Sequence, residues 1–360
     1  MSRLQSLREK LAQAGLEGIL IGSAANRRYM SGFTGSDGWL IISNSSAVIA
    51  VDFRYVEQAR LESSDFELFH VKGDITSWLP GLVKGQCIQK LGIEADHMPV
   101  SVYQAICKVM QAGDNPVQIL SSNHLVEPLR MTKDAAEMEY IKKACDIADG
   151  AIAFAAESLR PGISEKQFTL EIESYIRRHD SESLPFEIIA ASGPNSALPH
   201  ARPTDRIIGE GEPVTLDLGA RYRGYCSDIT RTFVTGKASD EFYKIYNAVL
   251  TAQLTALSVI KSEMTGAVAD KLIRDMIDKM GYGEMFGHGL GHGVGLETHE
   301  RPRLGMRSED ILTEGMVFTI EPGIYLPGWG GVRIEDTVTI LEGNVVPLTR
   351  AGKEALVGRL

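Results

Sequence analysis

The segment GHGLGHGVGLETHE, residues 287–300, places three of the chain's eight histidines among five glycines. An imidazole can bind a metal ion, move a proton or hold a substrate. Glycines allow the backbone to approach such a site closely, but a crowded turn uses them for the same reason. This segment alone therefore does not decide which of His288, His292 and His299 takes part in chemistry, and the acidic residues elsewhere in the chain narrow the choice.

Two acidic motifs in the sequence resemble each other. TLDLG (215–219) is followed by DIT (228–230), and TIEPG (319–323) is followed by EDT (335–337). In each case a Thr-apolar-acid-x-Gly strand leads through a glycine-containing turn to a second acid, with a threonine two residues later. A duplicated hairpin would produce this pattern, and chance similarity of two short motifs is the alternative.

The spacing of the acids predicts that they pair across hairpins. A turn between Tyr222 and Arg223 sets Asp217 opposite Asp228 in a hairpin over residues 214–233. Partners directly opposite each other have Cβ atoms roughly 4.5–5.5 Å apart. We therefore expect the two carboxylates to lie side by side.

The second hairpin gives the same result. A loop centred on Gly328 sets Glu321 opposite Glu335 in a hairpin over residues 318–338. Two carboxylates at this spacing repel each other unless a cation or a shared proton neutralises them. The alternative places all four acids on a solvent-exposed face, and the apolar neighbours of the acids weigh against it; these are Leu216, Leu218, Ile320 and Ile334.

Four carboxylates and one imidazole form a hard, oxygen-rich site suited to two divalent ions. Such ligands favour Mn²⁺, with Co²⁺ and Zn²⁺ as further options. Two ions roughly 3.5–4 Å apart acidify a water between them into a nucleophile near neutral pH. The residues therefore predict hydrolytic chemistry at a dinuclear centre.

The composition limits the other functions that the chain could have. At 360 residues, two domains are the default. A net charge of −10 argues against binding to nucleic acid or to an anionic membrane. No apolar run approaches the roughly 18–20 residues that span a bilayer, and the four scattered cysteines predict neither a disulfide framework nor a zinc site. These features favour a cytoplasmic enzyme.

Helices and strands of an α/β unit precede a region with long helices. Residues 1–18 read as an amphipathic helix, 18–22 and 116–120 as strands, 38–52 as a hairpin, and 102–113 as a helix ending at Gly113. Further helices are expected at 132–159, at 164–179 with Ser164 as N-cap, and near 239–262 and 267–280. We place an N-terminal domain at 1–125 and a catalytic domain at 126–360.

Several motifs together resemble a known family. LDLGARYRGYCSDITRT, GHGLGHGVGLETHE, IEPGIY and GGVRIEDT are similar to segments of the proline-specific metallopeptidases of the pita-bread fold, which include aminopeptidase P and prolidase. ASGPNSALPHARP, LRMTKDAAEMEYIKKA and SGFTGSDG are further similar segments. The resemblance implies an α/β creatinase-like N-terminal domain, an α+β pita-bread catalytic domain with pseudo-twofold symmetry, and a homodimer.

The resemblance also implies roles for individual residues. The metal ligands would be Asp217, Asp228, His292, Glu321 and Glu335, with Asp228 and Glu335 bridging the two ions. His200 and His299 would lie beside the metals and contact the substrate, and His288 would line the pocket for proline. Tyr325 and Arg333 would support the ligating acids.

The implied reaction is hydrolysis of an N-terminal Xaa-Pro bond by a metal-bridging water or hydroxide. Glu321 would act as general base and acid, and His299 would stabilise the oxyanion. The favoured reading is an aminopeptidase P-like enzyme acting on peptides with proline at the second position. Prolidase is the alternative, with Arg301 or Arg303 capturing the carboxylate of a dipeptide. A non-catalytic binding protein of the same fold is a third reading, which the intact ligand set disfavours.

Overall fold

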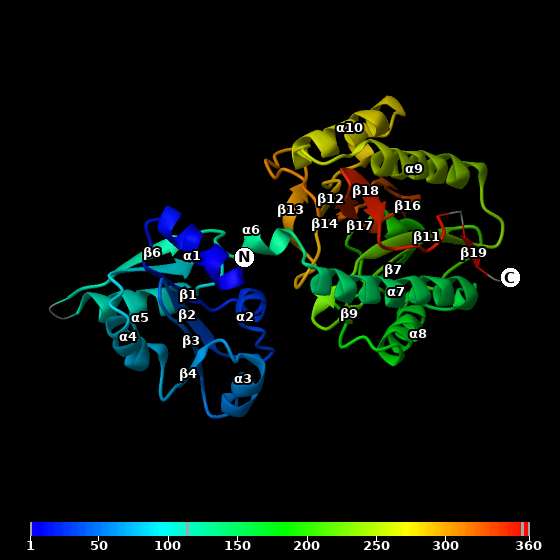
Figure 1. Ribbon diagram of the computed structural model, residues 1–360. Coiled ribbons are helices and arrows are strands. Elements are labelled where there is room, and N and C mark those ends of the chain that lie inside the picture. The colour runs from blue at the N-terminus through cyan, green and yellow to red at the C-terminus, as the bar shows by residue number, and fades with distance from the viewer. Residues whose placement is uncertain (1, 113–114, 354–355, 359–360) are drawn as a thin grey trace. The chain divides into compact units, whose positions relative to one another are not determined.

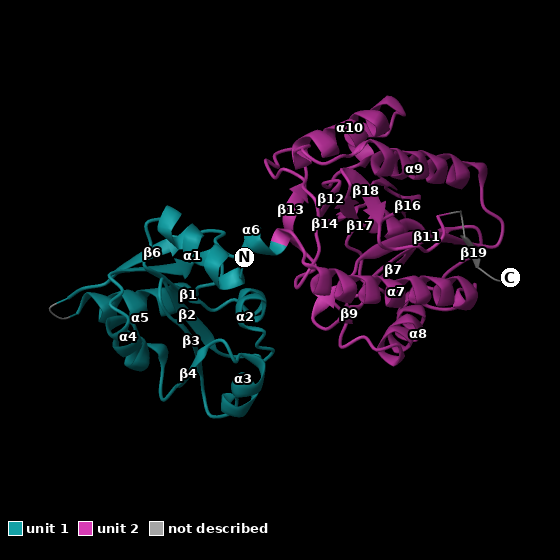
Figure 2. Ribbon diagram, in the orientation of Figure 1, with its two compact units in different colours: residues 1–130 teal, residues 131–360 magenta. Residues whose placement is uncertain are grey.

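The computed structural model describes residues 2–112, 115–353 and 356–358. The chain divides into two compact units, residues 1–130 and 131–360 (Figure 2). Among the described residues no helix is both long and apolar enough to cross a membrane.

The first unit is built on one mixed sheet of six strands in the order β4-β3-β2-β1-β5-β6. β1 pairs antiparallel with β2 and parallel with β5. The elements are α1 (Arg3–Gln13), β1 (Gly18–Ile21), α2 (Ala24–Ser31), β2 (Trp39–Ser43), β3 (Ala47–Val51), α3 (Val56–Glu62), β4 (Glu67–His70), α4 (Ile75–Gly85), β5 (Lys90–Glu94), α5 (Val100–Gln111), β6 (Gln118–Ser122) and α6 (Glu127–Met131).

The local patterns of this unit predicted its elements well. The amphipathic N-terminal helix is α1, where the Ser2 side chain accepts a hydrogen bond from the Gln5 amide. The predicted hairpin is the antiparallel pair β2 and β3. β6 begins two residues later than the strand expected at 116–120, and the predicted helix end at Gly113 lies outside the described residues.

The second unit consists of two similar halves. Figure 1 shows α7 and α8 on one face of its strands and α9 and α10 on the other. The first half contains α7 (Ala135–Ser158), α8 (Glu165–Arg178), β7 (Ile189–Ser192), the 3₁₀ helix η1 (Gly193–Ala197), β8 (Pro213–Leu218), β9 (Arg221–Tyr222), β10 (Tyr225–Cys226) and β11 (Ile229–Thr235). The four long helices of the unit were all predicted, because each has a regular apolar face and a capping residue.

The second half repeats the order of a helix pair followed by strands. It contains α9 (Asp240–Val259), α10 (Gly266–Lys279), the 3₁₀ helix η2 (Gly283–Met285), β12 (Gly291–Gly293), β13 (Glu300–Leu304), β14 (Val317–Ile320), β15 (Gly323–Leu326), β16 (Gly330–Arg333), β17 (Asp336–Leu341), β18 (Asn344–Pro347) and β19 (Leu356–Gly358). The larger sheets have the orders β19-β11-β8-β7 and β13-β12-β14-β17-β18.

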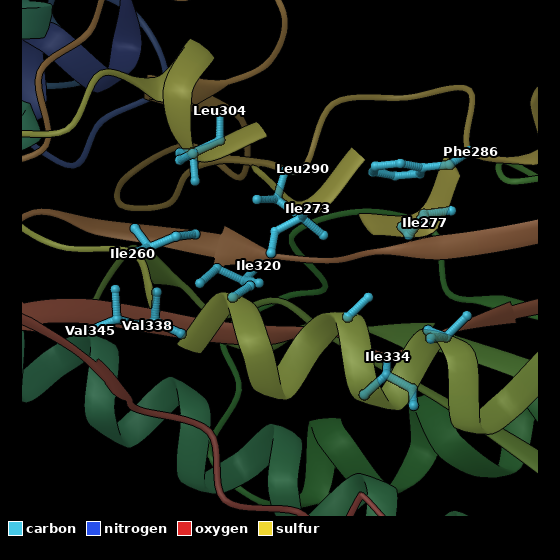
Figure 3. Close-up of a cluster of buried hydrophobic side chains, with 14 of the residues drawn as sticks. Ile260, Ile273, Ile277, Phe286, Leu290, Leu304, Ile320, Ile334, Val338 and Val345 are labelled. Carbon is cyan, nitrogen blue, oxygen red and sulfur yellow. The ribbon is translucent and has the colours of Figure 1, made fainter. Parts of the chain in front are cut away.

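Each half has its own hydrophobic core. In the first half, residues such as Ile152 and Phe168 of the helices pack against Leu216 of β8 and Phe233 of β11. The core of the second half is shown in Figure 3, where Ile273 of α10 lies beside Ile320 of β14; Ile277 and Val338 belong to the same cluster. The duplicated motif therefore reflects a duplicated helix-sheet unit, with its strands between two helix pairs.

One predicted hairpin register is wrong. Asp217 pairs with Thr230, not with Asp228, because the turn lies at Arg223 and Gly224, one residue later than expected. Both turn residues have positive φ, +49° and +81°, which is the conformation of a tight two-residue hairpin turn with glycine second. Asp228 lies just before β11, diagonally across from Asp217.

The other predicted register is confirmed. Ile320 pairs with Asp336 at the end of the β14–β17 ladder, and Gly323 pairs with Arg333 at the start of the β15–β16 ladder. Both ladders are centred on Gly328, as expected. Glu321 and Glu335 lie between the two ladders, at the point where the strands separate.

Candidate metal centre

The four acids come from strand ends of both halves of the second unit. Asp217 lies in β8, Asp228 precedes β11, Glu321 follows β14, and Glu335 lies between β16 and β17. A backbone hydrogen bond of 3.1 Å from the Glu335 amide to the Thr230 carbonyl joins the two halves at this point. The duplicated strands therefore bring their acids to a common centre.

Two threonines cross-link the halves beside the acids. The Thr230 hydroxyl donates to Glu335 Oε2 at 2.6 Å. The Thr337 hydroxyl donates to the Asp228 carbonyl at 2.7 Å and accepts from the Asp228 amide at 3.1 Å. These are the threonines found two residues after an acid in each sequence motif, so the repeat itself was the signal for a role that sequence reasoning did not assign.

His292 presents one ring nitrogen to the acids. Its Nδ1 lies 3.1 Å from the carbonyl oxygen of Gly293, which places the ring proton on Nδ1 and leaves a lone pair on Nε2. Nε2 lies 3.4 Å from Glu321 Oε1 and 3.7 Å from Asp228 Oδ2. Ligand atoms of Asp228, His292 and Glu335 all lie within 4.8 Å of one another.

The electrostatics of the cluster call for a cation. Burial, followed by the charges of the neighbouring acids, raises the pKa of Asp228 and of Glu335 well above their ordinary values. Burial also raises the pKa of Glu321. Asp228 is 4 % and Glu335 2 % exposed, so water hydrates these carboxylates poorly. A bound proton or a metal ion must therefore neutralise their charge.

Asp217 has one oxygen available for a ligand. Its Oδ2 accepts a hydrogen bond of 2.6 Å from Arg333 Nη2. Its Oδ1 is buried without a hydrogen-bond partner among the described residues, which is costly for a carboxylate oxygen. This orphaned oxygen, together with the imidazole lone pair of His292 and the other three carboxylates, matches the donor set that hard divalent ions bind.

Arg333 begins a chain of hydrogen bonds that leads away from the acids. Its Nη1 donates to the Tyr325 hydroxyl at 2.8 Å, and that hydroxyl lies 2.9 Å from His288 Nε2. His288 Nδ1 lies 2.8 Å from the Gly289 carbonyl, so Nε2 is the acceptor of the Tyr325 proton. Arg333 contacts an acid as expected, whereas Tyr325 acts on the acids only through Arg333.

A cavity of about 470 Å³ opens beside the cluster. Every predicted site residue except Tyr325 lines it, including the three histidines His200, His288 and His299. The His299 ring centre lies 4.2 Å from that of His292. The structure therefore gathers the predicted residues around one cavity within the second unit.

Three of the cavity histidines, His288, His292 and His299, have lowered pKa values and are held in their neutral form. Burial lowers the pKa of His288. Burial and the neighbouring His292 ring lower the pKa of His299 to about 4. At neutral pH His299 can therefore donate one N–H to a substrate oxygen while its other nitrogen carries a lone pair.

A buried ion pair behind the cluster was missed at the sequence level. Arg231 and Asp336 are both fully buried, with Nη2 2.8 Å from Oδ1. Arg231 Nη1 also donates to the Glu335 carbonyl at 2.5 Å, so the pair supports the backbone of a predicted ligand. An arginine among the apolar residues of β11 was the available signal.

Comparison with known proteins agrees with this geometry. Metallopeptidase family M24 matches residues 139–342, and the creatinase/prolidase N-terminal domain matches residues 3–132. The chain is 37 % identical to an Xaa-Pro dipeptidase of Pyrococcus furiosus, covering 98 % of this chain and 99 % of that protein.

Solved structures are similar over the whole chain. An Xaa-Pro dipeptidase from Bacillus anthracis is 43 % identical, covers 99 % of each chain and superposes with a TM-score of 0.95. An X-Pro aminopeptidase from Thermotoga maritima is 36 % identical, with 97 % of this chain and 99 % of that chain covered and a TM-score of 0.88. The fold of the second unit is the pita-bread fold expected from the sequence, and the chain belongs to metallopeptidase family M24 with a creatinase/prolidase N-terminal domain.

Proposed function

We propose that this protein hydrolyses the bond between a first residue and proline in Xaa-Pro dipeptides, at a centre of two divalent metal ions. The observation that carries the proposal is the convergence on one cavity of two buried carboxylates, two partly buried carboxylates and one imidazole lone pair, with one Asp217 oxygen left without a partner among the described residues. Asp217, Asp228, His292, Glu321 and Glu335 would hold the ions. When bound, such ions polarise the scissile carbonyl and supply an acidified water.

The remaining residues would bind the substrate and move protons. Glu321, whose pKa is raised by burial, is suited to take a proton and return it to the leaving nitrogen of proline. Neutral His299 would donate to the carbonyl oxygen as charge develops on it. His200 and His288 would hold the substrate from the cavity wall.

The apolar wall of the cavity supports proline at the second position of the substrate. Its wall includes the apolar side chains of Phe186, Ile189 and Leu304. A proline ring can pack against such a surface, and its tertiary amide has no N–H that would need a partner there. Relatives named Xaa-Pro dipeptidase support the same substrate class.

The two arginines considered at the sequence level occupy different environments. Arg301 forms an ion pair with Asp310. Arg303 lines the cavity, and its guanidinium has no hydrogen-bond partner among the described residues. A planar guanidinium is suited to bind a carboxylate, so Arg303 would recognise the free carboxyl group of a dipeptide.

Aminopeptidase P-like activity is the second candidate, and the similarity to the Thermotoga maritima enzyme favours it. Assays of Gly-Pro and Gly-Pro-Ala with added Mn²⁺ separate the two. A dipeptidase should cleave Gly-Pro with a higher kcat/KM than Gly-Pro-Ala. Arg303→Ala should raise KM for Gly-Pro, and the control variant Arg301→Ala should change that KM less.

Other results would point elsewhere. Equal or better cleavage of Gly-Pro-Ala would establish the aminopeptidase. Metal binding without cleavage of either peptide would favour a non-catalytic binding protein. We further propose that the natural ion is Mn²⁺ and not Co²⁺ or Zn²⁺, which metal analysis of the purified protein tests. We also propose a homodimer, which light scattering tests, and a cytoplasmic location.

A further inference from the structure

A fully buried glutamate outside the metal centre organises one wall of the cavity. Glu165 is the first residue of α8 and has 0 % exposure. Its Oε1 accepts from the Ser192 amide and hydroxyl, both at 2.8 Å, and its Oε2 accepts from the Thr204 amide at 3.0 Å and hydroxyl at 2.6 Å. The Asn195 side chain donates to both oxygens, at 3.1 and 3.2 Å.

These donors mark the two ends of one loop. Ser192 ends β7, and residues 193–204 follow it before the chain leaves the cavity. The loop residues Pro199, His200, Ala201, Arg202 and Pro203 line the cavity. Glu165 thus holds together the beginning and the end of the loop that carries His200, and we call residues 192–204 the His200 loop.

The middle of this loop is attached elsewhere. The Pro199 carbonyl accepts from Arg333 Nη1 at 3.3 Å, and the Ser196 hydroxyl accepts from the Gly331 amide at 2.8 Å. His200 lies between these attachments and the Thr204 end. Its position therefore depends on the Thr204 end being held in place.

The corresponding place in the other half has no such carboxylate. At the start of α8, the Glu165 amide donates to the Arg206 carbonyl and the Lys166 amide donates to the Thr204 carbonyl. The start of α10 has the same pattern: the Gly266 amide donates to the Asp310 carbonyl and the Ala267 amide donates to the Ser308 carbonyl. Gly266 thus corresponds to Glu165. A Cβ at Gly266 would collide with the Arg303 carbonyl, so there the backbone packs directly and leaves no room for a side chain.

The carboxylate is also not needed to start its own helix. The Ser164 side chain accepts from the Gln167 amide at 3.2 Å and caps α8. Each of the donors to Glu165 instead belongs to the His200 loop. These hydrogen bonds tie both ends of the loop to one buried side chain.

We infer that Glu165 is a positioning residue that sets His200 for substrate binding and leaves metal binding unaffected. The inference rests on the proposed function, in which His200 contacts the peptide. Loss of the Glu165 carboxylate should therefore change KM by moving His200, through the His200 loop.

The first test compares Glu165→Gln with a matched control. The amide keeps the volume of the side chain but replaces one acceptor oxygen with a donor, so it must lose bonds to one end of the loop. The control is Asp149→Asn, since Asp149 accepts from the Arg350 and Ala351 amides and holds no part of the His200 loop. Thr204→Val serves as a second variant. It removes the 2.6 Å bond to Glu165, together with the bonds that the Thr204 hydroxyl accepts from the Arg206 amide at 3.1 Å and from Asn195 Nδ2 at 3.4 Å, and it keeps the carboxylate itself.

Three measurements on the full-length protein follow, with KM and amide exchange measured after loading with Mn²⁺. Glu165→Gln should raise KM for Gly-Pro roughly ten- to a hundredfold, the range caused by small misplacements in active sites, with a smaller change in kcat. Titration of Mn²⁺ into the metal-free variant should give the wild-type affinity. Amide hydrogen exchange should accelerate at Ser192 and Thr204, whereas Asp149→Asn should alter none of these three.

A double-mutant cycle asks whether the effect passes through His200. In a His200→Ala background, Glu165→Gln should raise KM much less than in the wild type, because coupled residues do not add. Full additivity, an unchanged KM, or a loss of Mn²⁺ affinity would each overturn the inference.

Failure of the proposed function would look different. If the wild type cleaves neither peptide, the proposed activity is wrong, and amide exchange still decides whether Glu165 orders the loop. If Glu165→Gln does not fold, Thr204→Val carries the same comparison. An unchanged exchange rate at Thr204 in that variant would contradict the positioning role.

Discussion

Arg333 donates from Nη2 to Asp217 Oδ2 at 2.6 Å, while Oδ1 of the same carboxylate is buried without a partner among the described residues. One oxygen is therefore fixed in orientation and the other is left for a ligand. The pair explains how the charge of Asp217 can be balanced by Arg333 while one oxygen stays available for a ligand. The following predictions test the site that this arrangement implies.

Asp228→Asn should abolish both metal binding and peptidase activity. The substitution preserves the backbone hydrogen bonds to Thr337 but removes a charge at the centre of the cluster. The loss should exceed the roughly 10–100-fold typical of residues that only contact a ligand. Metal content by elemental analysis and hydrolysis of Gly-Pro provide the measurements. Glu187→Gln is the control, because Glu187 lines the same cavity but is exposed and pairs with Arg202; an active, metal-free Asp228→Asn protein would refute the mechanism.

Arg333→Lys should weaken metal binding even though the charge is kept. The guanidinium contacts Asp217, Tyr325 and the Pro199 carbonyl at once, and an ammonium group cannot reproduce that geometry. We expect Mn²⁺ affinity to fall by roughly 10–100-fold. Calorimetric titration measures it, and Tyr325→Phe should have a smaller effect, because it removes the bonds of Tyr325 to Arg333 and His288 but leaves the bond from Arg333 to Asp217. Equal affinities for Arg333→Lys and the wild type would show that Asp217 needs no orienting partner.

His299 should make the metal-free protein sensitive to mild acid. Its pKa is lowered to about 4 in the folded state, from 6.5 for an unperturbed histidine. Between these values the unfolded chain binds the proton and the folded chain does not, so this group lowers the free energy of unfolding as pH falls from 6.5 towards 4. Urea unfolding of the wild type and of His299→Asn across this range should show a steeper loss for the wild type. Parallel curves for the two proteins would contradict the lowered pKa.

Arg231→Met should destabilise the catalytic unit strongly. It removes one of the two cations that pair with buried Asp336, the other being Lys353, and breaking a buried pair typically costs about 3–5 kcal/mol. Arg160→Met is the matched control, since Arg160 and its partner Glu171 are partly exposed and such pairs contribute about 0–1 kcal/mol. Urea unfolding with bound metal removed compares the two variants. A similar loss in both would mean that burial adds nothing to the Arg231 pair.

Local patterns predicted the framework of the site. The helices of the catalytic unit were recognised because a regular apolar face and a capping side chain are determined by residues a few positions apart, as at Ser164. The hairpin that carries Glu321 and Glu335 was placed correctly, since its loop has a single centre at Gly328. The other hairpin was misplaced by one residue at the turn, because Tyr222, Arg223 and Gly224 allow neighbouring turn positions that only strand pairing distinguishes.

The sequence by itself determined the kinds of side chain, their helices and strands, and the family likeness that named the acids and histidines. Only the tertiary structure decided that the Thr230 hydroxyl meets Glu335, that one Asp217 oxygen lacks a partner within the part of the chain that the structure describes, and that Glu165 closes the His200 loop. Capping and periodicity depend on neighbours in the chain, so they can be read locally. These three features depend on how separate elements pack against one another, either within one half or between the two halves, so neighbours in the chain do not reveal them.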